Sequence, residues 1–267
     1  MNNIIEADNV SVSFGNGANR VYALRSVSFN LRTNETLGLV GESGSGKSTL
    51  AKVLSGIYRL SEGRVRIGDH EVTPERPRSL NSGASLQVIP QDPYSSLSPR
   101  RTAGQTMAEA LNPRRPSVQA YEEVIVRWLN RVGLGAEAVH KYPYQFSGGQ
   151  RQRIAIARAL CVDPDILIAD EITSALDLSV QAEILDLLHR LRDEIGISMM
   201  FISHNLGVVR RVSDRVAVLL HGELLEISET EEIFNHPSTN YTRKLLNSIP
   251  GAPGFSLKSA RTSIGSK

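Results

Sequence analysis

Apolar and polar side chains alternate along residues 4–14 and again along residues 21–31. This two-residue period is typical of β-strands that bury one face and expose the other. The residues Gly15-Asn16-Gly17 lie between the two stretches and are typical of a turn. The pattern therefore predicts two half-buried strands joined by a turn.

Further along the chain, short runs are apolar without alternation, and all are of strand length. They cover residues 37–41, 86–90, 166–170 and 198–203. Such runs are typical of parallel strands that are covered on both faces. Helical patterns lie between or beside them, at residues 47–57, 120–133, 150–161 and 179–195. Strands that alternate with helices predict an α/β fold.

Two stretches depart from this alternation. Residues 92–118 contain prolines at 93, 99, 113 and 116 and few strand-like runs. Together with the helical patterns that follow, they predict an insertion between two strands of the sheet, at about residues 92–161. Residues 251–267 are rich in glycine, serine and basic residues and contain no acidic residue, so we expect a disordered, solvated tail.

The composition is that of a soluble globular protein, with 40% hydrophobic and 22% charged residues. A net charge of +2 provides no general attraction to nucleic acid or to an anionic membrane. The single cysteine, Cys161, excludes an intrachain disulfide and a cysteine-rich metal site. The first residues do not resemble a signal peptide, and no apolar run reaches membrane-helix length. We therefore expect any membrane role to depend on a partner.

The clearest motif follows the apolar run at 37–41 and opens the helical pattern at residue 47. It consists of Gly41, Glu42, Ser43, Gly44, Ser45, Gly46, Lys47, Ser48 and Thr49. This sequence matches the phosphate-loop pattern GxxxxGK[ST]. Glycines allow the backbone to wrap around phosphates, whose charge is met by successive N–H groups and the helix N-terminus. Lys47 would reach the β- and γ-phosphates, and Ser48 would bind Mg²⁺. The alternative is a glycine-rich turn with no ligand.

Two acidic residues end the apolar run at 166–170. Asp170 is placed to hold Mg²⁺, and Glu171 is placed to orient or deprotonate a water. Two acids after a strand are also common as a solvated strand end. In combination with the phosphate loop, they favour hydrolysis of a nucleotide over transfer of its phosphate to another acceptor.

A second glycine motif precedes the helical pattern at 150–161. Ser147, Gly148, Gly149 and Gln150 follow Phe146 and form a second candidate anion site at a helix start. The alternative is an ordinary helix cap. With this motif upstream of Asp170 and downstream of the phosphate loop, the chain resembles the nucleotide-binding subunits of ABC transporters from residue 4 to about residue 250.

The resemblance implies a P-loop NTPase fold in one nucleotide-binding domain, residues 1–250. This fold has a RecA-like core, an antiparallel β subdomain and an inserted helical subdomain. It also implies roles for single residues. Phe14 matches the aromatic residue that stacks on adenine. Gln91 matches the residue that contacts Mg²⁺ and senses the transport subunit. His204 matches the switch histidine at the γ-phosphate.

The same resemblance identifies Asp170 as the Walker B aspartate and Glu171 as the general base. Residues 174–177 resemble the D-loop. Two positions depart from the family pattern. Ile172 stands where proline is usual, which would leave the turn after Glu171 freer. Phe146 stands where leucine is commonest, a change between apolar residues from which we expect little effect.

The resemblance also implies that the chain is an ATPase with ATP and Mg²⁺ as cofactors. The resemblance implies a head-to-tail dimer, with a second copy or with a sister ATPase subunit. It further implies that two membrane permease subunits dock near Gln91 and that a secreted solute-binding protein is an indirect partner. No nucleic-acid partner is expected. The expected location is the cytoplasmic face of the inner membrane, through the permeases.

Two segments of the sequence indicate a branch of the family. Residues 91–100 and the stretch from His236 to Leu246 resemble the oligopeptide, dipeptide and nickel importers. Peptides are thus the favoured cargo, with nickel, opines and glycosides as alternatives. Other classes also remain open: a soluble ABC-type ATPase of translation or DNA repair, a small-molecule kinase, and a nucleotide-binding regulator without hydrolysis. An ATPase of translation would usually carry a second cassette, and one of DNA repair would carry long heptad repeats. A kinase would leave residues 147–150 and His204 unexplained.

Overall fold

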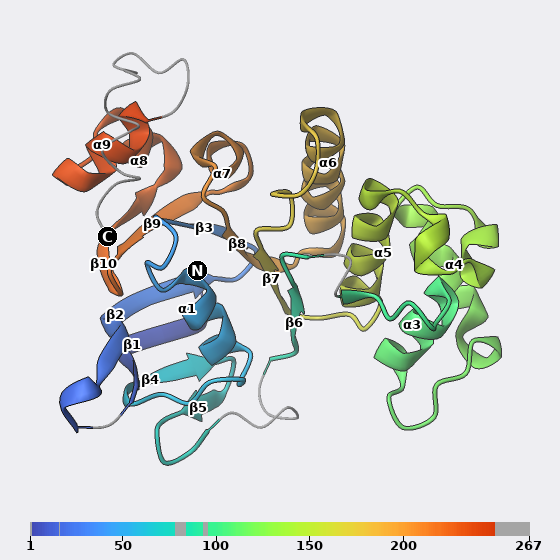
Figure 1. The fold of residues 1–267 in the computed structure, drawn as a ribbon, viewed down its shortest axis with the longest axis horizontal. Helices are drawn as coiled ribbons and strands as arrows, with labels where there is room; N and C mark the ends of the chain where they lie inside the picture. Colours follow the sequence, from blue (N-terminus) through green and yellow to red (C-terminus); the bar gives the residue numbers. More distant parts are fainter. Residues whose placement is uncertain (1, 16, 78–83, 93–95, 249–267) are drawn as a thin grey trace. The chain divides into compact units, whose positions relative to one another are not determined.

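The computed structural model describes residues 2–15, 17–77, 84–92 and 96–248 (Figure 1). The chain forms two compact units. The terminal unit contains residues 1–67, 71–78 and 201–267, and the middle unit contains residues 68–70 and 79–200. The division falls within strand β8 (Ser198–Ile202). The predicted tail, residues 251–267, lies outside the described residues.

The terminal unit contains an antiparallel sheet with the strand order β2-β1-β4-β5. Its strands are β1 (Asn3–Phe14), β2 (Val21–Arg32), β4 (Glu62–Ile67) and β5 (His70–Val72). Apolar side chains of β1 and β2, such as Ile5, Val10 and Leu24, are buried, while several of their neighbours are exposed. The predicted pair of half-buried strands is therefore confirmed.

Parallel strands follow in the same unit. β3 (Thr36–Val40) pairs in parallel with β9 (Arg215–Leu220), and β10 (Glu223–Glu229) adds to β9 in antiparallel orientation. Every residue of β3 is buried, as its continuous apolar run predicts. The helices of this unit are α1 (Lys47–Leu54), α7 (Leu206–Val212), α8 (Thr230–Asn235) and α9 (Asn240–Asn247).

The predicted helix over 47–57 was wrong at its end, because α1 stops at Leu54. Gly56 takes a left-handed φ of 80°, a conformation that ends a helix and favours glycine. The amide of Gly56 donates to the carbonyl of Val53, and that of Ile57 donates to the carbonyl of Lys52. These bonds satisfy the last carbonyls of α1 and turn the chain away.

In the middle unit, β6 (Leu86–Ile89) and β7 (Ile166–Asp170) pair in parallel. Its helices are α3 (Ala103–Leu111), α4 (Glu122–Arg131), α5 (Gly148–Leu160) and α6 (Leu178–Ile195). Short 3₁₀ turns occur at Gln119–Tyr121, Ala136–His140 and Pro143–Gln145, and another at Gly17–Asn19 in the terminal unit. The combination of parallel strands and helices confirms the α/β class.

Helix α3 was not predicted, because the prolines of residues 92–118 obscured its helical pattern. Pro99 and Pro113 lie outside the helix on either side. The start of the helix is marked by a capping box, in which Thr102 accepts from the amide of Gln105 and Gln105 accepts from the amide of Thr102. The predicted bounds of the single domain and of its insertion remain predictions. Within the described residues, no helix has both the length and the apolar character needed to cross a membrane.

Candidate functional site

The phosphate loop connects β3 to α1 in the terminal unit. Gly46 caps α1 with a φ of 109°, a conformation that favours glycine. At Gly41, a Cβ atom would lie 2.1 Å from the carbonyl oxygen of Leu219, so any side chain there would displace backbone. Both positions require glycine for the loop to take this path.

The side chain of Lys47 folds back over the start of the loop. Its residue is only 5% exposed, and its Nζ donates to the carbonyl oxygens of Gly41 and Glu42, at 2.8 Å each. The first turn of α1 contains no acidic residue. A cation and a positive helix end therefore share one short loop, which is the donor set that a phosphate chain requires.

Two other predicted site residues lie in the same unit. Phe14 ends β1, is 45% exposed and meets the ring of Tyr58 edge-to-face at 5.3 Å. His204 is exposed in the turn between β8 and α7. The preceding residue, Ser203, donates its amide to the carbonyl of Leu39, two residues before Gly41. The turn with His204 therefore starts beside the strand that leads into the phosphate loop.

Sequence reasoning missed one contact with the loop. The amide of Glu42 donates to the hydroxyl oxygen of Tyr241 on α9, at 3.2 Å. Partial burial raises the pKa of the Tyr241 hydroxyl above its ordinary value. In the sequence, the stretch from His236 to Leu246 indicated only the family branch. It did not predict the contact between Tyr241 and the phosphate loop.

In the middle unit, two predicted residues meet directly. Gln91 follows β6, and its Nε2 donates to the Oε2 atom of Glu171 at 3.1 Å. Asp170 is the last residue of β7, and Glu171 follows it with a φ of 47°. The structure thus brings Gln91, Asp170 and Glu171 to the same ends of two neighbouring parallel strands.

The turn after Glu171 is held without the proline that is usual in the family. The carbonyl of Glu171 accepts from both the amide and the hydroxyl of Ser174, at 3.0 and 2.9 Å. Ile172 is buried, and the hydroxyl of Thr173 accepts from Gln181. Hydrogen bonds and burial hold the turn where a proline ring would otherwise restrict it.

Ser147 is the N-cap of α5. Its hydroxyl accepts from the amide of Gln150, and the Gln150 side chain accepts from the amide of Ser147. Gly148 and Gly149 form the first turn, where helix amides have no acceptor within the helix. A Cβ atom on Gly149 would lie 2.5 Å from Cγ1 of Val180 on α6, so Gly149 also permits close packing of two helices.

The D-loop stretch leads into α6, whose N-cap is Asp177. The carboxylate of Asp177 accepts from the amide of Val180 and the hydroxyl of Ser179, at 2.9 and 2.7 Å. These bonds, the one from Val180 first, lower the pKa of the Asp177 carboxyl. The predicted site residues are therefore divided between the two units. The terminal unit contains Phe14, the phosphate loop and His204, and the middle unit contains Gln91, Asp170, Glu171 and residues 147–150.

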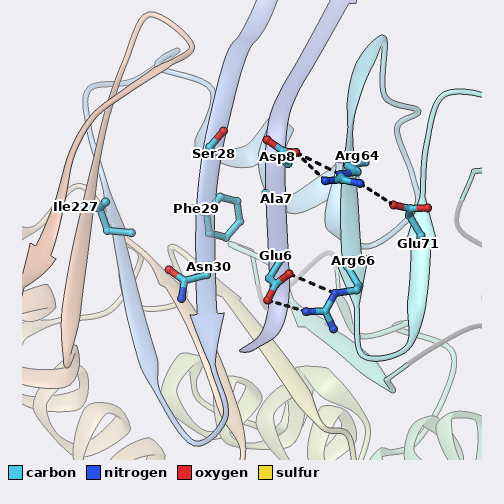
Figure 2. A pocket seen from close by; sticks show the side chains of 10 residues that line it. All are labelled: Glu6, Ala7, Asp8, Ser28, Phe29, Asn30, Arg64, Arg66, Glu71 and Ile227. Carbon is cyan, nitrogen blue, oxygen red and sulfur yellow. Dashed lines mark hydrogen bonds and ion pairs between the residues drawn. The ribbon is translucent and has the colours of Figure 1, made fainter. Parts of the chain in front are cut away.

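A hollow of about 560 Å³ on the antiparallel sheet involves none of these residues (Figure 2). Charged residues of β1, β4 and β5 line it and pair with one another. Arg66 pairs with Glu6 at 2.6 Å, and Arg64 lies between Asp8 and Glu71, at 3.2 and 3.6 Å. The charged side chains that line this hollow are therefore paired with one another.

Comparison with known proteins agrees with the motifs. The family model described as "ABC transporter" matches residues 24–174, a little over half of the chain. The oligopeptide transport ATP-binding protein AmiF of Streptococcus pneumoniae serotype 4 is 40% identical over 251 residues, which cover 92% of this chain and 82% of AmiF. The glutathione import ATP-binding protein GsiA of Pectobacterium atrosepticum is 43% identical over 235 residues, which cover 87% of this chain and 38% of GsiA.

Solved structures extend the likeness to the fold. One is the dimeric, post-hydrolysis form of the ATP-binding cassette MJ0796 bound to ADP and Pi. It has a TM-score of 0.72 and 27% identity, and the match covers 85% of this chain and 98% of that one. Another is cbiO1 of Clostridium perfringens, part of the ABC transporter complex cbiONQ, with a TM-score of 0.75, 26% identity and coverage of 88% and 92%. The chain belongs to the ABC transporter family, among its ATP-binding subunits.

Proposed function

We propose that this chain binds ATP at residues 41–49 and hydrolyses it to drive the import of a small solute, with peptides as the favoured cargo. The observation that carries the proposal is the phosphate loop. There, the ammonium of Lys47 is held at the start of a helix by two carbonyls of the loop, at 2.8 Å. A buried lysine in such a loop is ready to meet a phosphate chain.

Each predicted residue then has a proposed task. Lys47 and the amides of residues 44–49 bind phosphate oxygens, and the ring of Phe14 stacks on the base. Ser48, Gln91 and Asp170 would hold Mg²⁺, and the bound ion would neutralise phosphate charge. Glu171 takes the proton of the attacking water, while His204 faces the γ-phosphate.

The interaction between Gln91 and Glu171 supports this assignment of the base. An amide donor at 3.1 Å orients the carboxylate of Glu171 through its Oε2 atom. Gln91 is also the proposed contact with the transport subunit. We propose that movement of Gln91 by that subunit changes the orientation of Glu171 and thereby its ability to accept a proton.

The finer partners follow from the same proposal. Ser147, Gly148, Gly149 and Gln150 act on the ATP of the opposite subunit in a head-to-tail dimer, with a second copy or with a sister ATPase. Two permease subunits hold this dimer at the cytoplasmic face of the inner membrane, and a secreted binding protein delivers the solute. The names of AmiF and GsiA, which refer to oligopeptide and glutathione transport, support a peptide-like cargo.

Nucleotide binding tests the phosphate loop. Lys47→Ala is expected to reduce ATP affinity at least tenfold, because a charge-assisted contact of about 1.5–3 kcal/mol is lost. Lys52→Ala, in the last turn of the same helix, is the matched control and should bind ATP as the wild type does. Titration calorimetry with ATP and Mg²⁺ measures both variants. Wild-type affinity in Lys47→Ala would contradict the proposed site.

The rate of ATP hydrolysis tests the proposed role of Glu171 as the general base. Glu171→Gln should lower ATP hydrolysis by the assembled complex by about 10²- to 10⁴-fold, since the amide cannot take a proton. Glu123→Gln removes a carboxylate that is exposed on α4 of the same unit and serves as the control. Phosphate release from complexes in proteoliposomes gives the rates. Equal rates of hydrolysis in Glu171→Gln and Glu123→Gln would contradict the role of Glu171 as the base.

Cargo is tested in the same proteoliposomes by adding the secreted binding protein. Peptide-loaded binding protein should stimulate hydrolysis of ATP, whereas nickel, an opine or a glycoside should not. Stimulation by one of these three alone would keep the ATPase proposal and replace the cargo.

A further inference from the structure

The peptide groups of Glu42 are held on both sides. Its amide donates to the hydroxyl oxygen of Tyr241 at 3.2 Å, and its carbonyl accepts from Nζ of Lys47 at 2.8 Å. The partner of the amide comes from α9, about 200 residues further along the chain. A residue at the start of the phosphate loop is thus tied to the last described helix.

Helix α9 is itself anchored. The Glu226 carboxylate on β10 accepts from the amides of Ser238 and Thr239, at 2.7 and 3.3 Å, and from the hydroxyl of Thr242, at 2.7 Å. Thr239 also caps α9 by accepting from the amide of Thr242, which is 1% exposed. Since these bonds fix both the start of α9 and its first turn, Tyr241 lies in a defined place.

The protonation states of Glu226 and Tyr241 are consistent with these hydrogen bonds. Partial burial raises the pKa of Glu226, but the hydrogen bonds from Ser238 and Thr242 outweigh it and lower the pKa overall, so the anchor is a carboxylate at neutral pH. The raised pKa of Tyr241 keeps its hydroxyl protonated. Neutral pH therefore leaves both the anchor and the contact with Glu42 intact.

We propose that Tyr241 is a positioning residue for the phosphate loop, which raises nucleotide affinity by fixing the Glu42 peptide before the nucleotide arrives. The inference rests on the proposed nucleotide site. Lys47 is oriented by the carbonyls of Gly41 and Glu42, so an ordered Glu42 also orders the ammonium. Ordering a loop in advance removes part of the entropy cost of binding.

The test compares Tyr241→Phe with Tyr121→Phe. The hydroxyl of Tyr121 accepts one hydrogen bond, from Nδ2 of Asn112 at the same 3.2 Å, but Tyr121 belongs to the middle unit. Both changes remove one hydroxyl and keep the ring. Tyr241→Phe should weaken the binding of ATP and ADP about three- to tenfold, the loss expected for one hydrogen bond, while Tyr121→Phe should leave both affinities unchanged.

A second measurement separates positioning from a general loss of stability. Amide hydrogen exchange, followed residue by residue, should become faster at Glu42 in Tyr241→Phe without nucleotide, and not in Tyr121→Phe. Unchanged exchange at Glu42, or equal nucleotide affinities in the two variants, would overturn the inference.

Lys47→Ala distinguishes the two proposals. If Lys47→Ala loses nucleotide binding while Tyr241→Phe binds as tightly as Tyr121→Phe does, the nucleotide site stands and the role of Tyr241 is refuted. If Lys47→Ala binds as the wild type does, the nucleotide site itself is wrong, and with it this inference.

Discussion

Glu171 combines an unusual backbone conformation with a side-chain partner. Its φ of 47° lies in the left-handed region, which costs a non-glycine residue of order 1 kcal/mol. The two bonds from Ser174 to its carbonyl offset that cost, and Gln91 fixes its carboxylate. The strained position and the proposed proton acceptor are the same residue. Strain of this kind is found at functional sites, where the surrounding structure holds it.

Cys161 allows a prediction at the same scale. Burial raises the pKa of its thiol to about 12, and its Sγ donates to the carbonyl of Arg158 at 3.2 Å. The thiolate is the reactive form, and an exposed cysteine has a pKa of about 8.5. The folded protein should therefore resist iodoacetamide at about pH 8, whereas the urea-unfolded chain should be alkylated fully.

Intact mass measured over time in both conditions checks this. Alkylation of the folded protein at the rate of the unfolded chain would show that Cys161 is accessible. Nucleotide should not change the result, because Cys161 ends α5 at the opposite end from Ser147.

At the scale of elements, α5 and α6 pack closely at their N-terminal ends. Gly149 lies in the first turn of α5, and Val180 lies in the first turn of α6. Sequence reasoning assigned Gly149 to anion binding alone. The closeness of Val180 shows that Gly149 also sets the distance between α5 and α6.

The packing of Gly149 against Val180 predicts that a smaller residue at 180 compensates for a larger one at 149. Gly149→Ala should destabilise the protein by about 1–3 kcal/mol, because the new Cβ atom would lie 2.5 Å from Cγ1 of Val180. Val180→Ala removes Cγ1 and should restore most of the loss in the double variant. Urea denaturation of the four proteins in a double-mutant cycle gives the coupling energy. Additive effects would place the cost of Gly149→Ala elsewhere.

The elements that the sequence predicted well are those whose burial has a simple period. Strands β1, β2, β3 and β7 follow the alternating or continuous apolar runs within one residue. The end of α1 and the whole of α3 were missed, since a left-handed Gly56 and a capping box at Thr102 set them locally. Predictions from periodicity do not detect such signals unless caps are examined one by one.

The candidate site divides in the same way. Motifs gave the phosphate loop and the acids after β7, because the chemistry needs fixed residue types at fixed spacing. The contact between Tyr241 and Glu42 joins residues far apart in sequence. No spacing rule reports such a contact, so only the folded structure reveals it.

At the scale of the molecule, a buried ion pair connects the two sheets of the terminal unit. Arg215 of β9 donates to the Glu35 carboxylate at 3.2 Å and to two oxygens of Asn30 on β2. The side chains of Arg215 and Glu35 are only 9% and 5% exposed. The amide of Arg32 also donates to Glu35, at 2.7 Å. The pair therefore joins strands that belong to different sheets.

Breaking one half of the pair should cost more than removing both halves. Arg215→Ala leaves the Glu35 carboxylate buried without its cation and should destabilise the protein by about 3–5 kcal/mol. The double variant Glu35→Gln with Arg215→Met should lose less, because no charge remains buried. Urea denaturation compares the two. A larger loss in the double variant would mean that the pair stabilises the unit through its charge.

The burial of the only cysteine has a practical consequence. Because the thiol of Cys161 is buried, reporter thiols can be added and labelled in the folded protein without first replacing this residue. Glu223→Cys on β10 and Arg127→Cys on α4 would carry one nitroxide spin label in each unit. Electron resonance distances between the labels, measured with and without ATP, would then report whether nucleotide changes the separation of the two labelled positions.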